Sequence, residues 1–500
     1  MTAVSTAPRA DETRRKRRLG GPRDGRLLRA LPLLIALLAV GLRAINLSRA
    51  YDLFIDEPFY VDVGRSVADG GLPYARGDFF FLHPPGYFLL EALWMQVFGS
   101  AGDLFDQVFR TRYLNVLLSG VTVLLMWTVA RRLGGTRAAV IAALVYALDP
   151  WIIRQNSFVL LETATLTWVL LGYLLLLKAR DAGARRNRWL FGAGLAFGLA
   201  VLTKEFAVLV TLFPLALMAW RRWEVTRREA GVLGVLTCVP FGLWLLVIVG
   251  SGHWDDFSRE VSSGLRRVAG TEQATGFNSP NAPSFTSTLL TNGVQFWTTY
   301  LVLGLGCVAA VLLYRAGRAE HRVLVAFVAG AVPMLAYGVV AGANEEQFFN
   351  FLWVPAVLAV AVLAAQRWPA LRARRWLVLP LVALAVVSYA GNWAAVHLDR
   401  DDGAYQVDRW MQANVAPGTV VGVTNSVQRE IFTRYRMVDD VSATSLDGTG
   451  AQYLVVFRRQ IDQGYGFLPS TELDRQVAGL TPVYDRTTRG NGRIEVFRLR

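Results

Sequence analysis

The chain has 500 residues, of which 53% are hydrophobic, and it carries a formal net charge of +14 at pH 7. Its apolar residues come in runs of roughly 15 to 22, near the length that spans a bilayer, which indicates a polytopic membrane protein. The basic residues concentrate in every second loop, so the positive charge reflects membrane topology and argues against a nucleic-acid partner. The two cysteines, Cys238 and Cys307, both fall in expected spans, which excludes a disulfide framework.

Hydropathy divides the chain into a short tail and a series of expected membrane spans. Residues 1–27 form a basic tail that we expect to be disordered and cytoplasmic. Eleven spans are predicted, with ends uncertain by a few residues. They cover residues 28–47, 113–130, 137–150, 158–177, 189–203, 206–220, 231–250, 293–314, 323–341, 348–366 and 376–396.

The distribution of Lys and Arg predicts the orientation, because basic residues near span ends resist translocation. The N-terminal "RRKRR" and the loops "RRLGGTR", "KARDAGARRNR", "RRWEVTRRE", "RAGRAEHR" and "RWPALRARR" are all basic. The N-terminus is therefore expected inside and, with an odd number of spans, the C-terminus outside. A signal peptide ending near "SRA" is the alternative for the first run, but its length and the many spans that follow favour an uncleaved helix.

Three outer segments are too long to be simple connections, and function is expected there. They are residues 48–112, residues 251–292 and everything after about 397. Residues 28–397 are expected to form one transmembrane domain. Residues 398–500 read as a small extracytoplasmic α/β domain, with helices near 405–415 and 470–480 and strands near 419–423, 453–457, 481–485 and 493–499.

The first outer segment places Asp56 and Glu57 side by side in "YDLFIDEPFY". One reading is a helix start, with Asp at the N-cap and Pro58 in the first turn. The other is functional, because carboxylates near bilayer depth are costly and usually serve a pathway or a site. Adjacent helical residues point about 100° apart. One of the pair would then act as a base, while the other orients it or holds structure.

Three further side chains stand out in the outer segments. His83 follows three phenylalanines in "FFFLHPPGYF"; an extended X-Pro-Pro stop explains the prolines, while the imidazole could donate to a phosphate. Glu162 lies about a turn inside the apolar run of the fourth span, where an acid is more informative than at the boundary. Arg154 could offer a positive charge to the same outer region, although interfacial snorkelling is the favoured reading.

Lys204 is one of three lysines in the chain and the one expected at an outer span end, between the fifth and sixth spans. A mutual ion pair with the adjacent Glu205 in a tight turn is the simplest reading. The functional alternative is an ammonium aimed at a lipid phosphate, a point-charge role that Lys performs well.

Taken together, "DEPFY", "HPPGYFLLEAL", "LDPWIIRQNSFVLLETATL" and "GAGLAFGLAVLTKEFAVLV" resemble the C-type (GT-C) membrane glycosyltransferases that use lipid-phosphate sugars. The resemblance is closest to the protein O-mannosyltransferase family (glycosyltransferase family 39) and its bacterial relatives, which also resemble the aminoarabinose transferases. It covers most of residues 30–220, in the same order and spacing. It implies a mainly α GT-C fold of about eleven transmembrane helices with interfacial outer helices.

The resemblance also implies roles for particular residues. Asp56 corresponds to the catalytic base with Glu57 beside it, and Lys204 corresponds to a phosphate contact. Ser157 departs from the mannosyltransferases, which tend to have Arg there, and this weakens mannose as the donor sugar. The candidate site therefore comprises catalytic Asp56 and Glu57 and substrate-binding Lys204, His83, Glu162, Tyr60 and Arg154.

The implied reaction is transfer of a sugar from a polyprenyl-phosphate donor to a hydroxyl of a glycan, lipid or protein acceptor. It would occur at the outer face of the cytoplasmic membrane and invert the anomeric carbon. No cofactor is required by this scheme; a divalent metal on Asp56 or Glu162 is an alternative without a dedicated ligand cluster. A secondary transporter and a non-catalytic envelope scaffold are the competing readings, although no internal repeat typical of transporters is visible.

Overall fold

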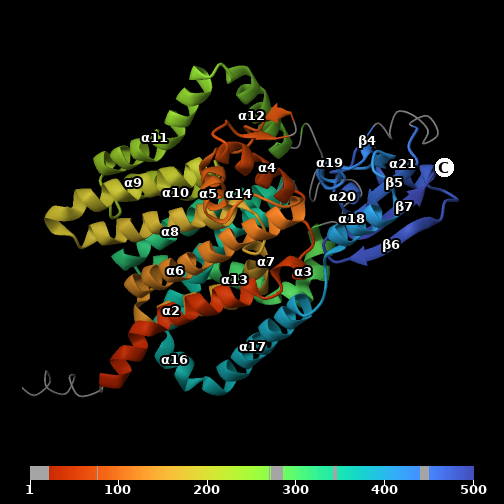
Figure 1. The fold of residues 1–500 in the computed structure, drawn as a ribbon. Helices are drawn as coiled ribbons and strands as arrows, with labels where there is room; N and C mark the ends of the chain where they lie inside the picture. Colours follow the sequence, from red (N-terminus) through yellow and green to blue (C-terminus); the bar gives the residue numbers. More distant parts are fainter. Residues whose placement is uncertain are drawn as a thin grey trace, which may run out of the picture.

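The computed structural model describes residues 22–75, 77–269, 271, 285–341, 346–439 and 450–499. A large helical bundle is followed by a small domain with a β-sheet at one end of the bundle (Figure 1). Most of the tail predicted over residues 1–27 and part of the second outer segment, 251–292, lie outside the described residues.

The helices of the bundle coincide with the predicted spans. The second and third spans belong to one long helix interrupted at Gly135, whose φ of +78° suits a residue without Cβ. The helices are α2 (Pro22–Ala44), α6 (Leu104–Leu148), α8 (Leu161–Arg180), α9 (Arg186–Thr203), α10 (Ala207–Arg221), α11 (Arg227–Gly250), α13 (Phe285–Arg315), α14 (Arg322–Ala341), α15 (Asn350–Gln366) and α17 (Arg375–His397).

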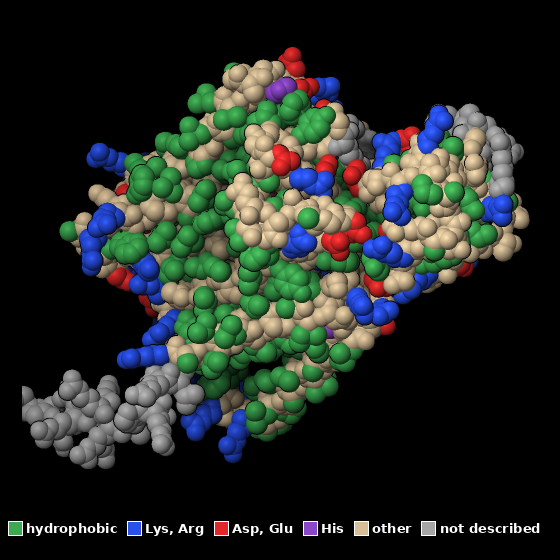
Figure 2. All heavy atoms as spheres, viewed as in Figure 1, with side chains coloured by type: hydrophobic (Ala, Val, Ile, Leu, Met, Phe, Trp, Pro, Cys, Tyr) green, Lys and Arg blue, Asp and Glu red, His purple; other side chains and the backbone are tan. Residues whose placement is uncertain are grey.

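Six helical segments among the described residues are long and apolar enough to cross a membrane: α6, α8, α11, residues 292–315 of α13, residues 346–366 and α17. The protein is therefore a multi-pass membrane protein, and the number of eleven spans stays a prediction. Figure 2 shows hydrophobic side chains covering the bundle, while Lys and Arg gather at the helix ends opposite the sheet domain. Within the bundle, α8 packs on α9, α9 on α11, and α2 on α6 around one hydrophobic core.

Short elements connect the helices at the end of the bundle that was predicted to face outward. They are α3 (Leu47–Ala50), α4 (Glu57–Ala68), β1 (Tyr74–Ala75), β2 (Asp78–Phe79), α5 (Gly86–Phe98), α7 (Pro150–Gln155), α12 (Trp254–Val268) and the 3₁₀ turn η4 (Glu346–Phe349). The helix α12 lies over the first outer segment, because the Glu260 carboxylate accepts the backbone N–H of Phe81. A further short helix, α16 (Trp368–Ala373), precedes α17.

The C-terminal residues form a five-stranded sheet with the order β4-β3-β5-β7-β6. β3 pairs in parallel with β4 and β5, whereas β7 is antiparallel to both β5 and β6. The short β4, α19 and α20 were not expected from the sequence. The elements are α18 (Gly403–Asn414), β3 (Val420–Val423), α19 (Ser426–Ile431), β4 (Arg436–Val438), β5 (Tyr453–Phe457), α20 (Arg458–Asp462), α21 (Ser470–Gln476), β6 (Pro482–Thr488) and β7 (Gly492–Arg498).

The sheet domain shares a hydrophobic core with the first outer segment. Buried Tyr51, Leu53 and Tyr60 belong to the same cluster as Val407 of α18 and Val455 of β5. A smaller cluster is confined to the domain itself, between the sheet and α21. The apolar core of the domain is therefore continuous with that of the first outer segment.

Candidate active site

Glu57 lies at the start of α4 and is completely buried. Its carboxylate forms a two-pronged ion pair with Arg112 of α6, with nitrogen-oxygen distances of 2.8 and 2.6 Å. The backbone N–H groups of Phe54 and Val159 donate to the same carboxylate, at 2.8 and 2.9 Å. Because both oxygens accept two hydrogen bonds each, Glu57 fixes the loop before α4 to α6 and to the segment before α8.

Arg112 also holds the loop before α4 through hydrogen bonds to its backbone. Its guanidinium is fully buried and also donates to backbone carbonyls. These carbonyls belong to Leu47, Tyr51 and Asp52, at 3.2, 3.0 and 3.0 Å. An arginine directly before the second predicted span was a signal in the sequence, since charges next to apolar runs often serve a site, but its partner was not visible there.

Asp56 occupies the N-cap position of α4, as the helix-start reading expected, but its side chain makes no capping hydrogen bond. Its backbone carbonyl accepts the N–H of Tyr60 at 3.0 Å, while the residue itself is only partly buried. The helix-start reading therefore accounts for the position of Asp56 and leaves its carboxylate unexplained. Tyr60 lies one turn later on the same helix and is 4% exposed.

Lys204 ends α9 and forms an ion pair with Glu162 in the first turn of α8. The two residues are 1% and 2% exposed, so the pair is nearly dry. The ammonium also lies 4.9 Å from the ring centroid of Phe348 in η4. The simplest sequence reading paired Lys204 with its neighbour Glu205, whereas the carboxylate that forms this ion pair comes from a different helix.

Glu205 instead contacts His83, with 3.2 Å between its Oε2 and the Nδ1 of the imidazole. His83 is 8% exposed, and its ring centroid lies 6.0 Å from that of Tyr60. Gly86 allows the loop that carries His83 to approach the end of α9. A Cβ on Gly86 would lie 2.7 Å from the carbonyl oxygen of Leu202, so only glycine fits without a shift.

Arg154 of α7 pairs with Glu346 of η4, and both side chains are partly exposed. Arg154 therefore has a carboxylate partner 192 residues away in the sequence, which the snorkelling reading did not include. The Arg154 guanidinium also lies 5.5 Å from the ring centroid of Phe158. The Phe158 ring in turn contacts that of Phe54 in the Asp56 loop, with 5.3 Å between centroids.

These contacts bring the candidate residues together from elements that are far apart in sequence. Tyr60 links the helix that Asp56 begins to His83, and Glu205 links His83 to the turn that contains Lys204. The imidazole of His83 thus lies between the helix that Asp56 begins and the turn that contains Lys204. No group of three or more His, Cys, Asp or Glu suited to a metal ion occurs among the residues with described positions.

Comparison with known proteins gives the family context. Residues 82–244 match the family model of dolichyl-phosphate-mannose-protein mannosyltransferases. An undecaprenyl phosphate-alpha-4-amino-4-deoxy-L-arabinose arabinosyl transferase of Pseudomonas paraeruginosa is 32% identical over 200 residues, 38% of this chain and 35% of the relative. A second transferase of that name, from Pseudomonas fluorescens, is 32% identical over 240 residues, 46% of this chain and 40% of the relative. The aligned part thus spans well under half of each relative.

Solved structures share the architecture over most of the chain. The oligosaccharyltransferase AglB of Archaeoglobus fulgidus, in complex with an inhibitory peptide and a dolichol-phosphate, has a TM-score of 0.62 at 13% identity. The similarity covers 95% of this chain and 74% of that protein. ArnT from Cupriavidus metallidurans, bound to undecaprenyl phosphate, has a TM-score of 0.51 at 17% identity, covering 96% and 98%. Residues 82–244 are thus similar in sequence to the mannosyltransferase family, and the chain shares the fold of these solved membrane proteins over most of its length.

Proposed function

We propose that the protein transfers a sugar from a polyprenyl-phosphate donor to an acceptor hydroxyl at the outer face of the cytoplasmic membrane. The observation that carries the proposal is a series of contacts between distant elements. Asp56 begins the helix that carries Tyr60, the Tyr60 ring lies beside His83, and His83 contacts Glu205, the residue after Lys204. The relatives named as undecaprenyl-phosphate aminoarabinose transferases support a donor of this class. The basic helix ends opposite the sheet domain support a cytoplasmic N-terminus (Figure 2).

The proposed step is a single displacement at the anomeric carbon. The acceptor oxygen forms the new bond to that carbon and gives its proton to the Asp56 carboxylate. The bond from the anomeric carbon to the phosphate oxygen breaks, and the electron pair leaves with the polyprenyl phosphate. Attack from the face opposite the leaving group inverts the configuration. Geometry should matter more than an altered pKa of Asp56 in this step.

Negative charge develops on the leaving phosphate, and cations placed in advance stabilise it. Lys204 is the proposed contact, because an ammonium buried to 1% exposure is held in a medium that strengthens its interaction with an anion. Glu162 offsets the cost of burying this charge and orients it. His83 and Arg154 are proposed as further donors to the phosphate or the sugar, and Tyr60 as an aromatic contact beside them.

Glu57 receives a different role from that of a reacting group. Four hydrogen bonds already engage its two oxygens in a fully buried position. We therefore assign it to holding the loop, which is one of the two roles that the sequence left open for this pair. The acceptor remains a glycan, lipid or protein hydroxyl, and a divalent cation at Asp56 or Glu162 remains a prediction.

The proposal can be tested in the producing organism by deleting the gene and complementing with variants. Envelope glycans and polyprenyl-phosphate sugars would be quantified by mass spectrometry. We expect deletion to remove one decoration and to accumulate its lipid donor, and Asp56→Asn to behave like the deletion. Asp69→Asn, an exposed carboxylate at the other end of α4, is the matched control and should restore the decoration.

Two outcomes would contradict the assignment. Full restoration by Asp56→Asn would exclude Asp56 as the base. Counterflow of a radiolabelled solute in proteoliposomes, with no glycosidic product in cells, would instead favour the transporter reading.

A further inference from the structure

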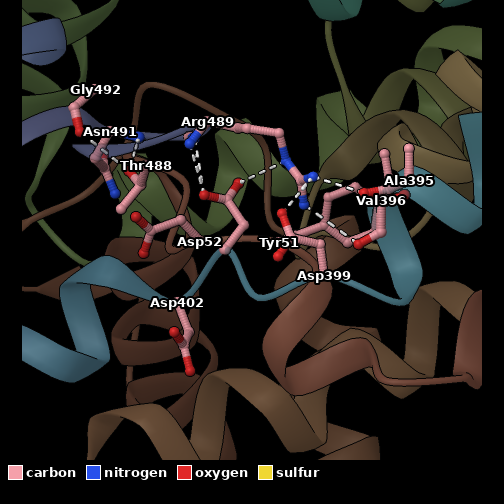
Figure 3. Close-up of polar contacts among 12 residues, drawn as sticks. Tyr51, Asp52, Ala395, Val396, Asp399, Asp402, Thr488, Arg489, Asn491 and Gly492 are labelled. Carbon is pink, nitrogen blue, oxygen red and sulfur yellow. Dashed lines mark hydrogen bonds and ion pairs between the residues drawn. The ribbon is translucent and has the colours of Figure 1, made fainter. Parts of the chain in front are cut away.

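The loop that precedes Asp56 is bound to the C-terminal domain by a reciprocal pair of contacts. The Asp52 carboxylate is 3% exposed and accepts the backbone N–H groups of Ala404, at the start of α18, and of Leu53, both at 2.9 Å. In the opposite direction, the side-chain amide of Asn491 donates to the carbonyl of Leu53 at 3.3 Å. Figure 3 shows Asp52 facing the turn that carries Asn491.

A second set of contacts fixes that turn, which comprises residues 489–492 between β6 and β7. The Asp401 carboxylate accepts the backbone N–H groups of Arg489 and Gly490, at 2.7 and 3.3 Å. The Arg489 guanidinium donates to the carbonyls of Ala395 and Val396, at 2.7 and 3.3 Å, near the end of α17 (Figure 3). The turn is therefore tied to the last membrane helix as well as to the Asp56 loop.

The packing at this junction leaves no room for an extra side chain. A Cβ on Gly490 would lie 2.6 Å from the Cβ of Asp52, well below any normal contact. Asp401 and Asn491 are 5% and 3% exposed, so the polar contacts between the two parts are shielded from water. Buried hydrogen bonds of this kind are costly to leave unmade, which makes the docked geometry specific.

The contacts reach Asp56 because the loop is short and held from two sides. From the bundle, Arg112 donates to the carbonyl of Asp52 and pairs with Glu57. From the C-terminal domain, the contacts just described hold Asp52 and Leu53. Asp56 lies between these anchors, four residues after Asp52 and one before Glu57. A shift of either anchor changes the position of its carboxylate.

We propose that the C-terminal domain is a working part of the active site, in which Asp52 and Asn491 are positioning residues that set the place of Asp56. The proposal rests on the proposed transferase function for its catalytic part. Arg459 of the domain also contributes to the charge environment of the Arg154–Glu346 pair, because Arg154 repels its guanidinium and Glu346 attracts it. The backbone N–H of Arg459 donates to the carbonyl of Asn491 at 3.3 Å, so the same turn places this cation.

The mechanical part can be measured without any substrate. We would record hydrogen–deuterium exchange of peptides covering residues 53–60 in the full-length protein in lipid nanodiscs. Asp52→Ala and Asn491→Ala should each speed exchange in this region at least tenfold. Asp52→Asn keeps an oxygen that can accept the Ala404 N–H and should stay near the wild type. Asp69→Ala, on the exposed end of α4, is the control. Unchanged exchange in both alanine variants would overturn the proposal.

The catalytic part uses the lipid extract of the deletion strain as donor and counts released polyprenyl phosphate. A displaced base should lower kcat about 10- to 100-fold, since a misplacement of about 1 Å can cost 10²-fold, while the KM for the lipid stays within about twofold. Faster exchange with an unchanged kcat in Asp52→Ala would overturn the positioning role. Absence of turnover in the wild type would instead refute the transferase function. The hydrogen–deuterium exchange result would then still test whether Asp52 and Asn491 hold the Asp56 loop.

Discussion

Substitution of Glu57 by Gln should destabilise the protein by about 3 to 5 kcal/mol, the cost of breaking a buried ion pair by changing one partner. Glu57 and Arg112 are both 0% exposed, so solvent cannot replace the lost charge. Gln keeps one oxygen, but its amide group would face an N–H donor. Arg112 keeps its three backbone carbonyl partners, so we expect the loss near the lower end of this range.

The measurement is reversible unfolding in mixed micelles with increasing sodium dodecyl sulfate, followed by circular dichroism. Asp485→Asn is the matched control, because its partner Arg493 is 51% exposed and Asp485 itself 41% exposed. Exposed pairs contribute about 0.2 to 1 kcal/mol. The double variant Glu57→Leu with Arg112→Met should recover part of the loss, since well-packed apolar residues often replace buried pairs at little cost. A cost below about 1 kcal/mol for Glu57→Gln would refute the reasoning.

Burial, and after it the nearby Asp401 carboxylate, raises the pKa of Asp52 to about 6 in the folded protein. The stabilisation that the protonated side chain provides is therefore fully present below the ordinary pKa near 4, and it is lost as the pH rises through 6. Asp52→Asn should therefore raise the melting temperature at pH 8 but not at pH 4, and parallel curves would contradict this. Lys204→Met should weaken binding of undecaprenyl phosphate at least tenfold in a detergent-based binding assay, whereas Lys178→Met should not; equal affinities would exclude Lys204 as the phosphate contact. Gly86→Val should lower turnover at least tenfold by forcing the loop that carries His83 away from the end of α9. Unchanged turnover would show that close contact between this loop and α9 is dispensable.

The membrane part was predictable because hydropathy is a local property of the chain. Every apolar run of bilayer length overlies a helix, since a spanning segment must satisfy its backbone hydrogen bonds internally. The candidate residues were also visible, because Asp56, Glu162 and Lys204 are ionisable groups next to apolar runs. Their roles came from a resemblance of ordered motifs, and these roles remain for the experiments above to decide.

The choice of partners could not be predicted, because it depends on which helices pack together. Lys204 was expected to pair with the adjacent Glu205, yet the packing of α8 on α9 places Glu162 beside it. Arg112 was not singled out at all, although its charge lies directly before the second predicted span. An ion pair between residues about 40 to 55 positions apart leaves no periodic trace in a single sequence.

The sequence by itself determined that the chain enters a membrane repeatedly, which outer segments carry the unusual charges, and that a small α/β region follows the last span. The tertiary structure alone decided that this region is docked onto the Asp56 loop and shares its core. The physical reason is that Asp52, Asp401 and Asn491 are ordinary polar residues in sequence. They acquire their meaning only when folding removes them from water and leaves one another, and the backbone between them, as their hydrogen-bond partners.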